Sequence, residues 1–145
     1  MSRYSDFLAS RLDLEDSPEA VLQLMLDQGW SDGLPVIPPT QERVRRMVEY
    51  VGREPGELIG YINPDGGAAT VEKIAVNGVM AGCAPEYMPV LIATVLALTE
   101  PEFNIHGLQT TTNPVAPLLI VNGPVRGQIG INSGRGCLGP GWRAN

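Results

Sequence analysis

Two cysteines and a single histidine are the side chains of this 145-residue chain best suited to catalysis. Cys83 lies between a glycine and a proline-led helix start, where unpaired N–H groups and the helix macrodipole lower the pKa of a thiol. A thiolate there could attack an electrophilic carbon or take up a proton. His106 is the only histidine, so we expect it to be the base if it reaches Cys83 or Cys137. A buried inert thiol and a structural histidine are the alternatives.

Cys137 belongs to the glycine-rich segment 123–145, where Gly134-Arg-Gly-Cys-Leu-Gly139 matches the letters of G-x-G-x-x-G. A dinucleotide site needs a strand before this motif and a helix that opens within it, whereas Pro140-Gly141 blocks a helix here. We expect instead a nest of backbone N–H groups that binds a carboxylate or phosphate with the help of nearby arginines. Glycines that only form tight turns are the alternative. The predicted binding residues are Gly134, Arg135 and Gly136, with Arg126 or Arg143 nearby.

The stretch 29–40, Gly-Trp-Ser-Asp-Gly-Leu-Pro-Val-Ile-Pro-Pro-Thr, is a connector stiffened by three prolines. Trp30 and Asp32 are its chemically able members, and we expect them in a pocket wall as substrate contacts. The alternative is a loop that packs its tryptophan on the core. Glu72 and Glu86 could supply a carboxylate base, but surface charges are the simpler interpretation. The chain has no C-x-x-C and no clustered carboxylates, so we expect neither a metal nor a cofactor.

Four helices are predicted to position these residues, at about 18–28, 40–51, 70–82 and 85–99. Ser17, Thr40 and Thr70 are the expected N-caps, and Gly52 is the expected end of the second helix. Strands are predicted at 57–62, 105–112 and 117–122, of which the last has the strongest pattern. We therefore expect one α/β or α+β domain over residues 1–145, with short central strands covered by helices. Residues 1–16 are expected to form an arm or short helix, and 123–145 a terminal loop.

Composition excludes several classes of function. The net charge of −6 argues against non-specific nucleic-acid binding. No apolar run is long enough to cross a bilayer, and the N-terminus lacks the apolar region of a secretory signal. Two cysteines without such a signal fit reduced thiols, so we expect a cytoplasmic protein.

Three stretches carry a resemblance to a known family: residues 29–40, Val71-Glu-Lys-Ile-Ala-Val-Asn-Gly-Val-Met-Ala-Gly-Cys-Ala-Pro-Glu-Tyr-Met-Pro89, and Gly139-Pro-Gly-Trp-Arg-Ala-Asn145. Together they resemble a poorly characterised bacterial family of small cysteine- or selenocysteine-containing proteins with a UGSC or CGSC motif. Members of that family continue past the Arg-Ala-Asn motif into a further α/β half. The resemblance thus implies that this chain corresponds to the N-terminal part and that a second polypeptide completes the fold. A genetic split and a cleavage after Asn145 both fit.

These patterns predict one subunit of a heteromeric, cysteine-dependent hydrolase or lyase that acts on a small carboxylate-bearing substrate. Cys83 or Cys137 would be the nucleophile or acid/base, and the glycine-rich backbone with Arg135 would hold the anion. The alternative is a non-catalytic structural or regulatory subunit whose glycine-rich tail docks into a catalytic partner.

Overall fold

The computed structural model describes residues 7–139 and 142–145. The first six residues of the expected arm and the Pro140-Gly141 break lie outside this part. The described residues form an α+β fold, 44% helical and 7% strand, which confirms the α+β alternative. The helices are α1 (Pro18–Asp27), α2 (Gln41–Val51), α3 (Val71–Met80), α4 (Met88–Thr99), α5 (Ile105–Thr110) and α6 (Pro124–Gln128), the strands β1 (Leu58–Ile62) and β2 (Gly67–Thr70), and the 3-10 turns η1 (Pro85–Tyr87) and η2 (Pro101–Phe103).

The predicted helix starts are confirmed, because each cap side chain accepts a bond from the first helical turn. Ser17 Oγ accepts from the N–H of Ala20 at 3.1 Å. The Oγ1 atoms of Thr40 and Thr70 do the same at the starts of α2 and α3. Gly52 ends α2 in the left-handed conformation, with φ 65°. Local capping chemistry thus fixes the helices that surround the core.

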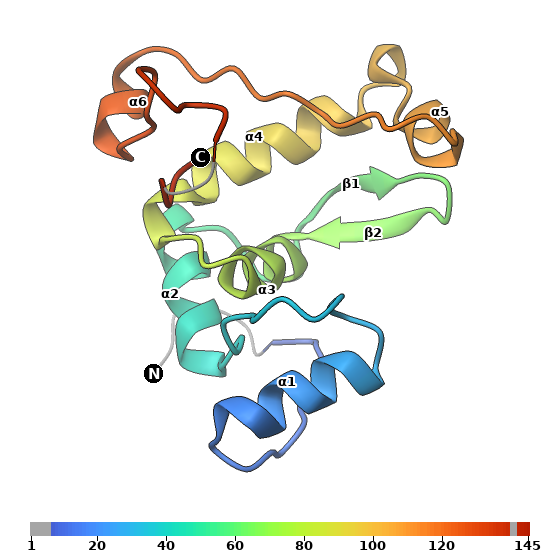
Figure 1. Ribbon diagram of the computed structural model, residues 1–145, viewed down its shortest axis with the longest axis vertical. Helices are drawn as coiled ribbons and strands as arrows, with labels where there is room; N and C mark the ends of the chain where they lie inside the picture. Colours follow the sequence, from blue (N-terminus) through green and yellow to red (C-terminus); the bar gives the residue numbers. More distant parts are fainter. Residues whose placement is uncertain (1–6, 140–141) are drawn as a thin grey trace.

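The sheet is a single antiparallel hairpin of β1 and β2, which projects beside α3 and α4 (Figure 1). Ile62 pairs with Gly67 next to the turn, and the register shifts between Leu58 and Gly60. β1 was predicted as 57–62, but β2 was not. Its sequence Gly-Ala-Ala-Thr has little β-propensity and forms a strand because β1 supplies the partner.

Two strand predictions are wrong. Residues 105–110 form helix α5, because Asn104 caps it from a left-handed conformation (φ 52°) and accepts a bond from the N–H of Gly107 at 3.2 Å. Residues 117–122 are extended but pair with no strand in the described part of the chain. In the segment expected to be a terminal loop, residues 124–128 form the short helix α6.

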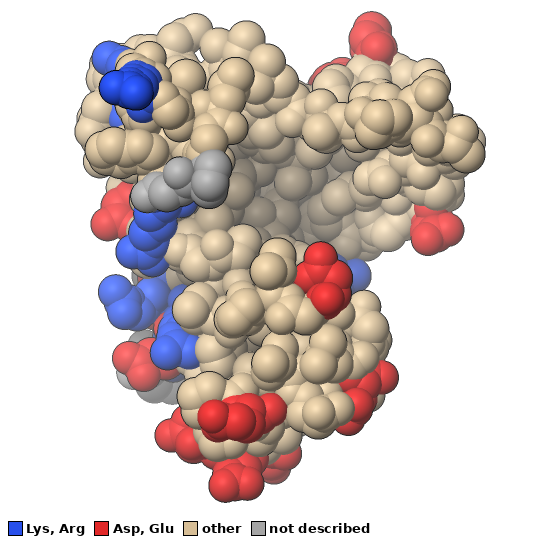
Figure 2. Space-filling model, viewed as in Figure 1, with Lys and Arg blue, Asp and Glu red and all other residues tan. Residues whose placement is uncertain are grey.

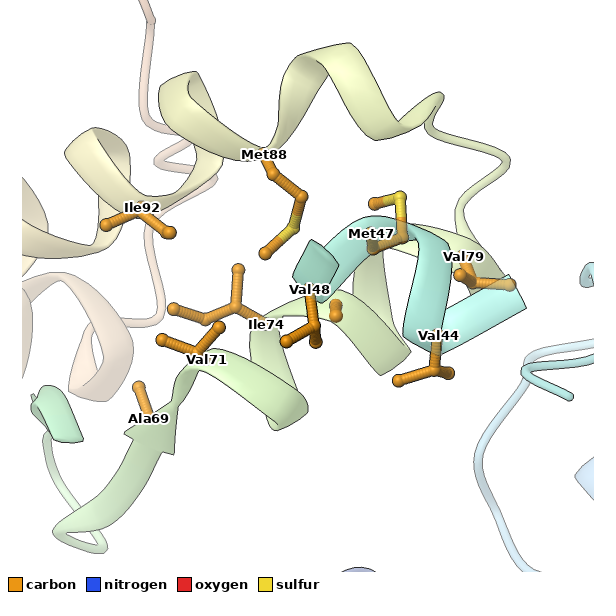
Figure 3. Packing of buried hydrophobic residues seen from close by; sticks show 10 residues of the cluster. Val44, Met47, Val48, Ala69, Val71, Ile74, Val79, Met88 and Ile92 are labelled. Atoms are coloured by element: carbon orange, nitrogen blue, oxygen red, sulfur yellow. The ribbon is translucent and has the colours of Figure 1, made fainter. Parts of the chain in front are cut away.

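The core lies where α2, α3 and α4 meet, and Figure 3 shows their side chains converging. Met47 and Met88 are its largest fully buried side chains. Gly78 of α3 permits the close approach, since a Cβ there would lie 2.9 Å from the Cε of Met47. The clustered residues are Val44, Met47, Val48, Ala69, Val71, Ile74, Ala75, Val79, Met88 and Ile92.

Glu72 is not a surface charge, because only 4% of it is exposed. Its two carboxylate oxygens accept bonds from the N–H groups of Leu8 and Ala9 at 3.0 and 3.1 Å. Both oxygens are therefore engaged in fastening the N-terminal arm to the first turn of α3. Glu72 is a structural anchor and is not available as a base.

We expect Glu72→Gln to lower the free energy of unfolding by about 1–3 kcal/mol, because one arm N–H would then face an amide N–H instead of an oxygen. Urea unfolding measures the loss, and hydrogen exchange should show faster exchange at Leu8 and Ala9. Glu49→Gln is the matched control, since Glu49 is exposed on α2. Equal stability and unchanged exchange in the Glu72 variant would contradict the anchoring role.

Among the described helices, none is by itself long and apolar enough to cross a membrane; only the bent pair 85–99 and 101–110, with a 72° break, passes on length and composition.

Candidate functional site

A pocket of about 320 Å³ opens at the end of α3, against α2. Ile37 of the proline-stiffened connector lines the pocket, and its N–H donates to Met80 O at 3.1 Å. The C-terminal tail closes another side. The lining residues are Ile37, Arg43, Arg46, Met47, Val79, Gly82, Cys83, Pro85 and Arg143.

Cys83 is half-buried in this pocket, but its backbone ends a helix and does not begin one. The N–H of Cys83 donates to Gly78 O at 2.8 Å, and the N–H of Gly82 donates to Val79 O at 2.9 Å. With Gly82 left-handed at φ 79°, these two bonds form a Schellman motif that closes α3. The expectation that a helix N-terminus lowers the thiol pKa is therefore wrong. Burial raises the pKa of Cys83, and the charge of Arg143 opposes this in part.

Three arginines line the pocket together with the thiol, and the charge of Arg143 is the one that acts on Cys83. Arg43 and Arg46 are three residues apart on α2, so they share one face of the helix. Arg43 Nη1 donates to Pro38 O at 2.9 Å, and Arg143 Nε donates to Gly82 O at 2.7 Å. Figure 2 shows Lys and Arg gathered along the flank that carries α2, whereas Asp and Glu gather mainly around α1.

No carboxylate neutralises these guanidinium groups within the described residues. The pocket lining contains no Asp or Glu, and the ion pair of the described chain, Arg53–Glu57, lies elsewhere. Arg46 makes no hydrogen bond to any described residue, so its donors are free for a ligand. The lining therefore carries positive charge although the whole chain has a net charge of −6, and positive charge attracts anions.

The tail that delivers Arg143 is held in shape by Asn145. Its side chain accepts from the N–H of Asn132 at 2.9 Å and donates to the carbonyls of Asn132 and Cys137 at 3.1 and 2.9 Å. These bonds tie Asn145 back to Asn132 and Cys137 and so form the tail loop. Arg143 then joins the loop to the body of the protein at Gly82.

Apart from Cys83 and Arg143, none of the predicted site residues lines this pocket. Trp30 and Asp32 are exposed in the connector, where Asp32 Oδ1 accepts from the N–H of Leu34 at 3.2 Å. His106 is exposed on α5. Cys137 is half-buried in the tail loop as a free thiol. The structure thus places Cys83 in the pocket without His106 or Cys137.

Three of the N–H groups in the predicted nest around Arg135 are engaged in turns of the same segment. The N–H of Gly134 donates to Asn132 Oδ1 at 2.9 Å, the N–H of Cys137 to Gly134 O at 3.2 Å, and the N–H of Gly139 to Gly136 O at 2.9 Å. Arg135 is exposed and outside the pocket. These contacts favour the alternative in which the glycines form tight turns.

Arg43 and Arg46, which line the pocket from α2, were not singled out from the sequence. Their spacing with Met47 was the available signal, because positions i, i+3 and i+4 lie on one side of a helix. Arg143 was named only as a neighbour of Arg135. Its contact with Gly82 spans 61 residues, and no local pattern reports such a contact.

The rate at which iodoacetamide alkylates Cys83 can be measured against pH in a Cys137→Ser variant. We expect the inflection of this rate profile to lie at a higher pH than that of a free cysteine. Burial raises the pKa of the thiol, so less thiolate is present at neutral pH. Arg143→Gln should move the inflection further up, because it removes a cation that favours the thiolate. Arg143→Lys should restore it, and Arg135→Gln should leave it unchanged. An inflection below that of free cysteine would contradict this.

No group of three or more His, Cys, Asp or Glu side chains in the described residues is placed to hold a metal ion. Comparisons of the chain with protein-family models, curated proteins and solved structures gave no match.

Proposed function

We propose that this chain binds a small carboxylate-bearing anion in the pocket of Arg43, Arg46 and Arg143, and that Cys83 reacts with it in a hydrolase or lyase reaction. The observation that supports this is a half-buried thiol among three guanidinium groups with no carboxylate in the lining. Arginine recognises carboxylates through paired N–H donors, which gives both affinity and orientation.

The raised pKa of Cys83 bears on the chemistry, because the resting group is a thiol. In hydrolysis, Sγ bonds to the carbonyl carbon, the leaving group departs with its bonding electron pair, and the thiol proton passes to it. Water then cleaves the thioester and returns the thiol. In a lyase reaction, a C–C bond breaks and its electron pair stays on one carbon, the same thiol donates its proton to that carbanion, and the thiolate regains a proton from water. An adjacent arginine stabilises the developing oxyanion in either case.

His106 has no part in this proposal, since it lies on α5 and lines no side of the pocket. The proposal keeps the second polypeptide implied by the family resemblance, and the reduced, cytoplasmic setting that suits two free thiols. The alternative function is a non-catalytic subunit whose tail docks into a partner. Against it, the tail is joined to its own body through Arg143.

Binding and turnover separate the two functions. Succinate and inorganic phosphate, titrated by calorimetry at constant ionic strength, test whether the pocket holds anions and whether it prefers carboxylate. A panel of carboxylate-bearing esters and hydroxy acids then tests turnover in the wild type, Cys83→Ser and Cys137→Ser. The proposal requires that Cys83→Ser binds succinate but loses turnover, while Cys137→Ser retains both. Turnover that survives both substitutions would refute the cysteine mechanism.

A further inference from the structure

The segment of residues 116–122 has the sequence of a strand, but it belongs to no sheet in the described part of the chain. It reads Ala-Pro-Leu-Leu-Ile-Val-Asn, and none of its backbone groups hydrogen bonds to any described residue. It runs beside α4, with an apolar groove between them (Figure 1). Exposed backbone donors and acceptors in an extended segment are a template for pairing with another strand.

Residues 116–120 are all exposed, and the degree of exposure alternates among the large side chains of residues 118–121. Leu118 and Ile120 are 71% and 82% exposed, whereas Leu119 is 50% exposed and Val121 less. Protein edges are normally guarded by charged side chains, but residues 103–125 contain no Asp, Glu, Lys or Arg. No charged side chain in this segment therefore opposes association, and Pro117 is its one residue without an N–H to donate.

Helix α4 shows the same lack of cover. Its sequence Met-Pro-Val-Leu-Ile-Ala-Thr-Val-Leu-Ala-Leu-Thr is almost wholly apolar, yet only Met88 and Ile92 are buried. A helix that is apolar on every side is normally surrounded by protein. The helix and the neighbouring segment thus form one continuous apolar surface.

We propose that residues 116–122 pair antiparallel with the same segment of a second copy of this chain. The segment is its own complement when it pairs about a two-fold axis at Leu119. Leu118 then lies opposite Ile120 of the copy, so the two most exposed side chains cover each other. Two uncharged strands meet without like-charge repulsion, and the largest group of acidic side chains in Figure 2 lies around α1, at the other end of the molecule.

Pro117 fixes the hydrogen-bonding pattern of this pair. It lacks an N–H, so its position opposite Val121 must be a non-hydrogen-bonded pair. The pairs alternate along antiparallel strands, so Leu118 and Ile120 exchange the N–H···O bonds, and the central Leu119 pair is non-hydrogen-bonded. The two Leu119 Cα atoms then lie about 4.5 Å apart, within the range of roughly 4.4–6.8 Å that a disulfide spans.

This register is tested by cross-linking. In a Cys83→Ser/Cys137→Ser background, Leu119→Cys should form a disulfide-linked dimer under mild oxidation, whereas Leu138→Cys, an exposed apolar position outside the segment, should not. Light scattering of the wild type at micromolar concentration should give twice the 15.5 kDa of one chain. Ile120→Lys should give a monomer with an unchanged circular dichroism spectrum, since it sets a charge against Leu118 of the copy.

A wild type that stays monomeric at high micromolar concentration would overturn the proposal. Binding of a different polypeptide to the segment would not rescue it. A dimer that persists in Ile120→Lys, or equal cross-linking at positions 119 and 138, would also overturn it. None of these readouts depends on the pocket at Cys83, so the proposed function can fail while this inference stands.

Discussion

Arg46→Gln is expected to weaken the binding of succinate by about 10- to 100-fold, because a hydrogen bond to a charged group contributes about 1.5–3 kcal/mol. Arg46 is the arginine of the pocket without a partner among the described residues, so its donors need break no existing bond to meet a ligand. Its substitution also leaves the connector and the tail in place, because Arg43 and Arg143 hold those. Calorimetric titration at constant ionic strength measures the loss.

The control for this prediction is Arg135→Gln, which changes the net charge equally but lies outside the pocket. It should bind succinate as the wild type does. Arg46→Lys should retain part of the affinity, since it keeps the charge but loses the paired donors. If Arg135→Gln weakens binding and Arg46→Gln does not, the anion site lies in the glycine-rich loop as the sequence first indicated.

The largest loss of stability is expected from Met88→Ala. Met88 is fully buried at the start of α4, where it packs into the cluster shared with α2 and α3. Its truncation leaves a cavity, so the free energy of unfolding should fall by about 2–5 kcal/mol. Urea unfolding with an unchanged m-value would show that the loss lies in the native state.

Leu96→Ala on the same helix is the matched control. Its side chain is 45% exposed, so its truncation removes less apolar contact and should cost less than Met88→Ala. Similar losses at both positions would mean that Leu96 is covered in solution. That outcome would support the association of the α4 surface described above and would leave the role of Met88 to be tested by Met88→Leu, which preserves volume.

The local parts of the fold could be predicted from the sequence. The helix starts at Ser17, Thr40 and Thr70 were predictable because an N-cap side chain bonds to a backbone N–H only three residues further along the chain. Strand β2 could not be found, because its small residues have no preference without β1 beside them. The strand predicted at 105–112 was wrong for a related reason. The isoleucine and threonines of this stretch favour a strand, but the Asn104 cap and the preceding turn η2 start helix α5 there.

The candidate site was predictable only in part. Cys83 was identified, but it was predicted at the start of a helix and lies at the end of α3. The pair Gly82-Cys83 is compatible with either position in the sequence. Gly82 was the available sign, since a left-handed glycine commonly closes a helix. Glu72 and Arg143 act through contacts 63 to 64 and 61 residues away, which only the folded chain reveals.

Under the proposed function, the bond from Arg143 to Gly82 links the order of the tail thermodynamically to the occupancy of the pocket. An anion that binds Arg143 in its docked position favours the docked tail by the same free energy with which docking favours the anion. Docking the tail loop, which Asn145 holds together, costs conformational entropy. This cost makes the binding free energy of the proposed site less favourable. Selection for tighter binding could accordingly act on Asn132 or Asn145, far along the chain from Cys83 and touching no ligand.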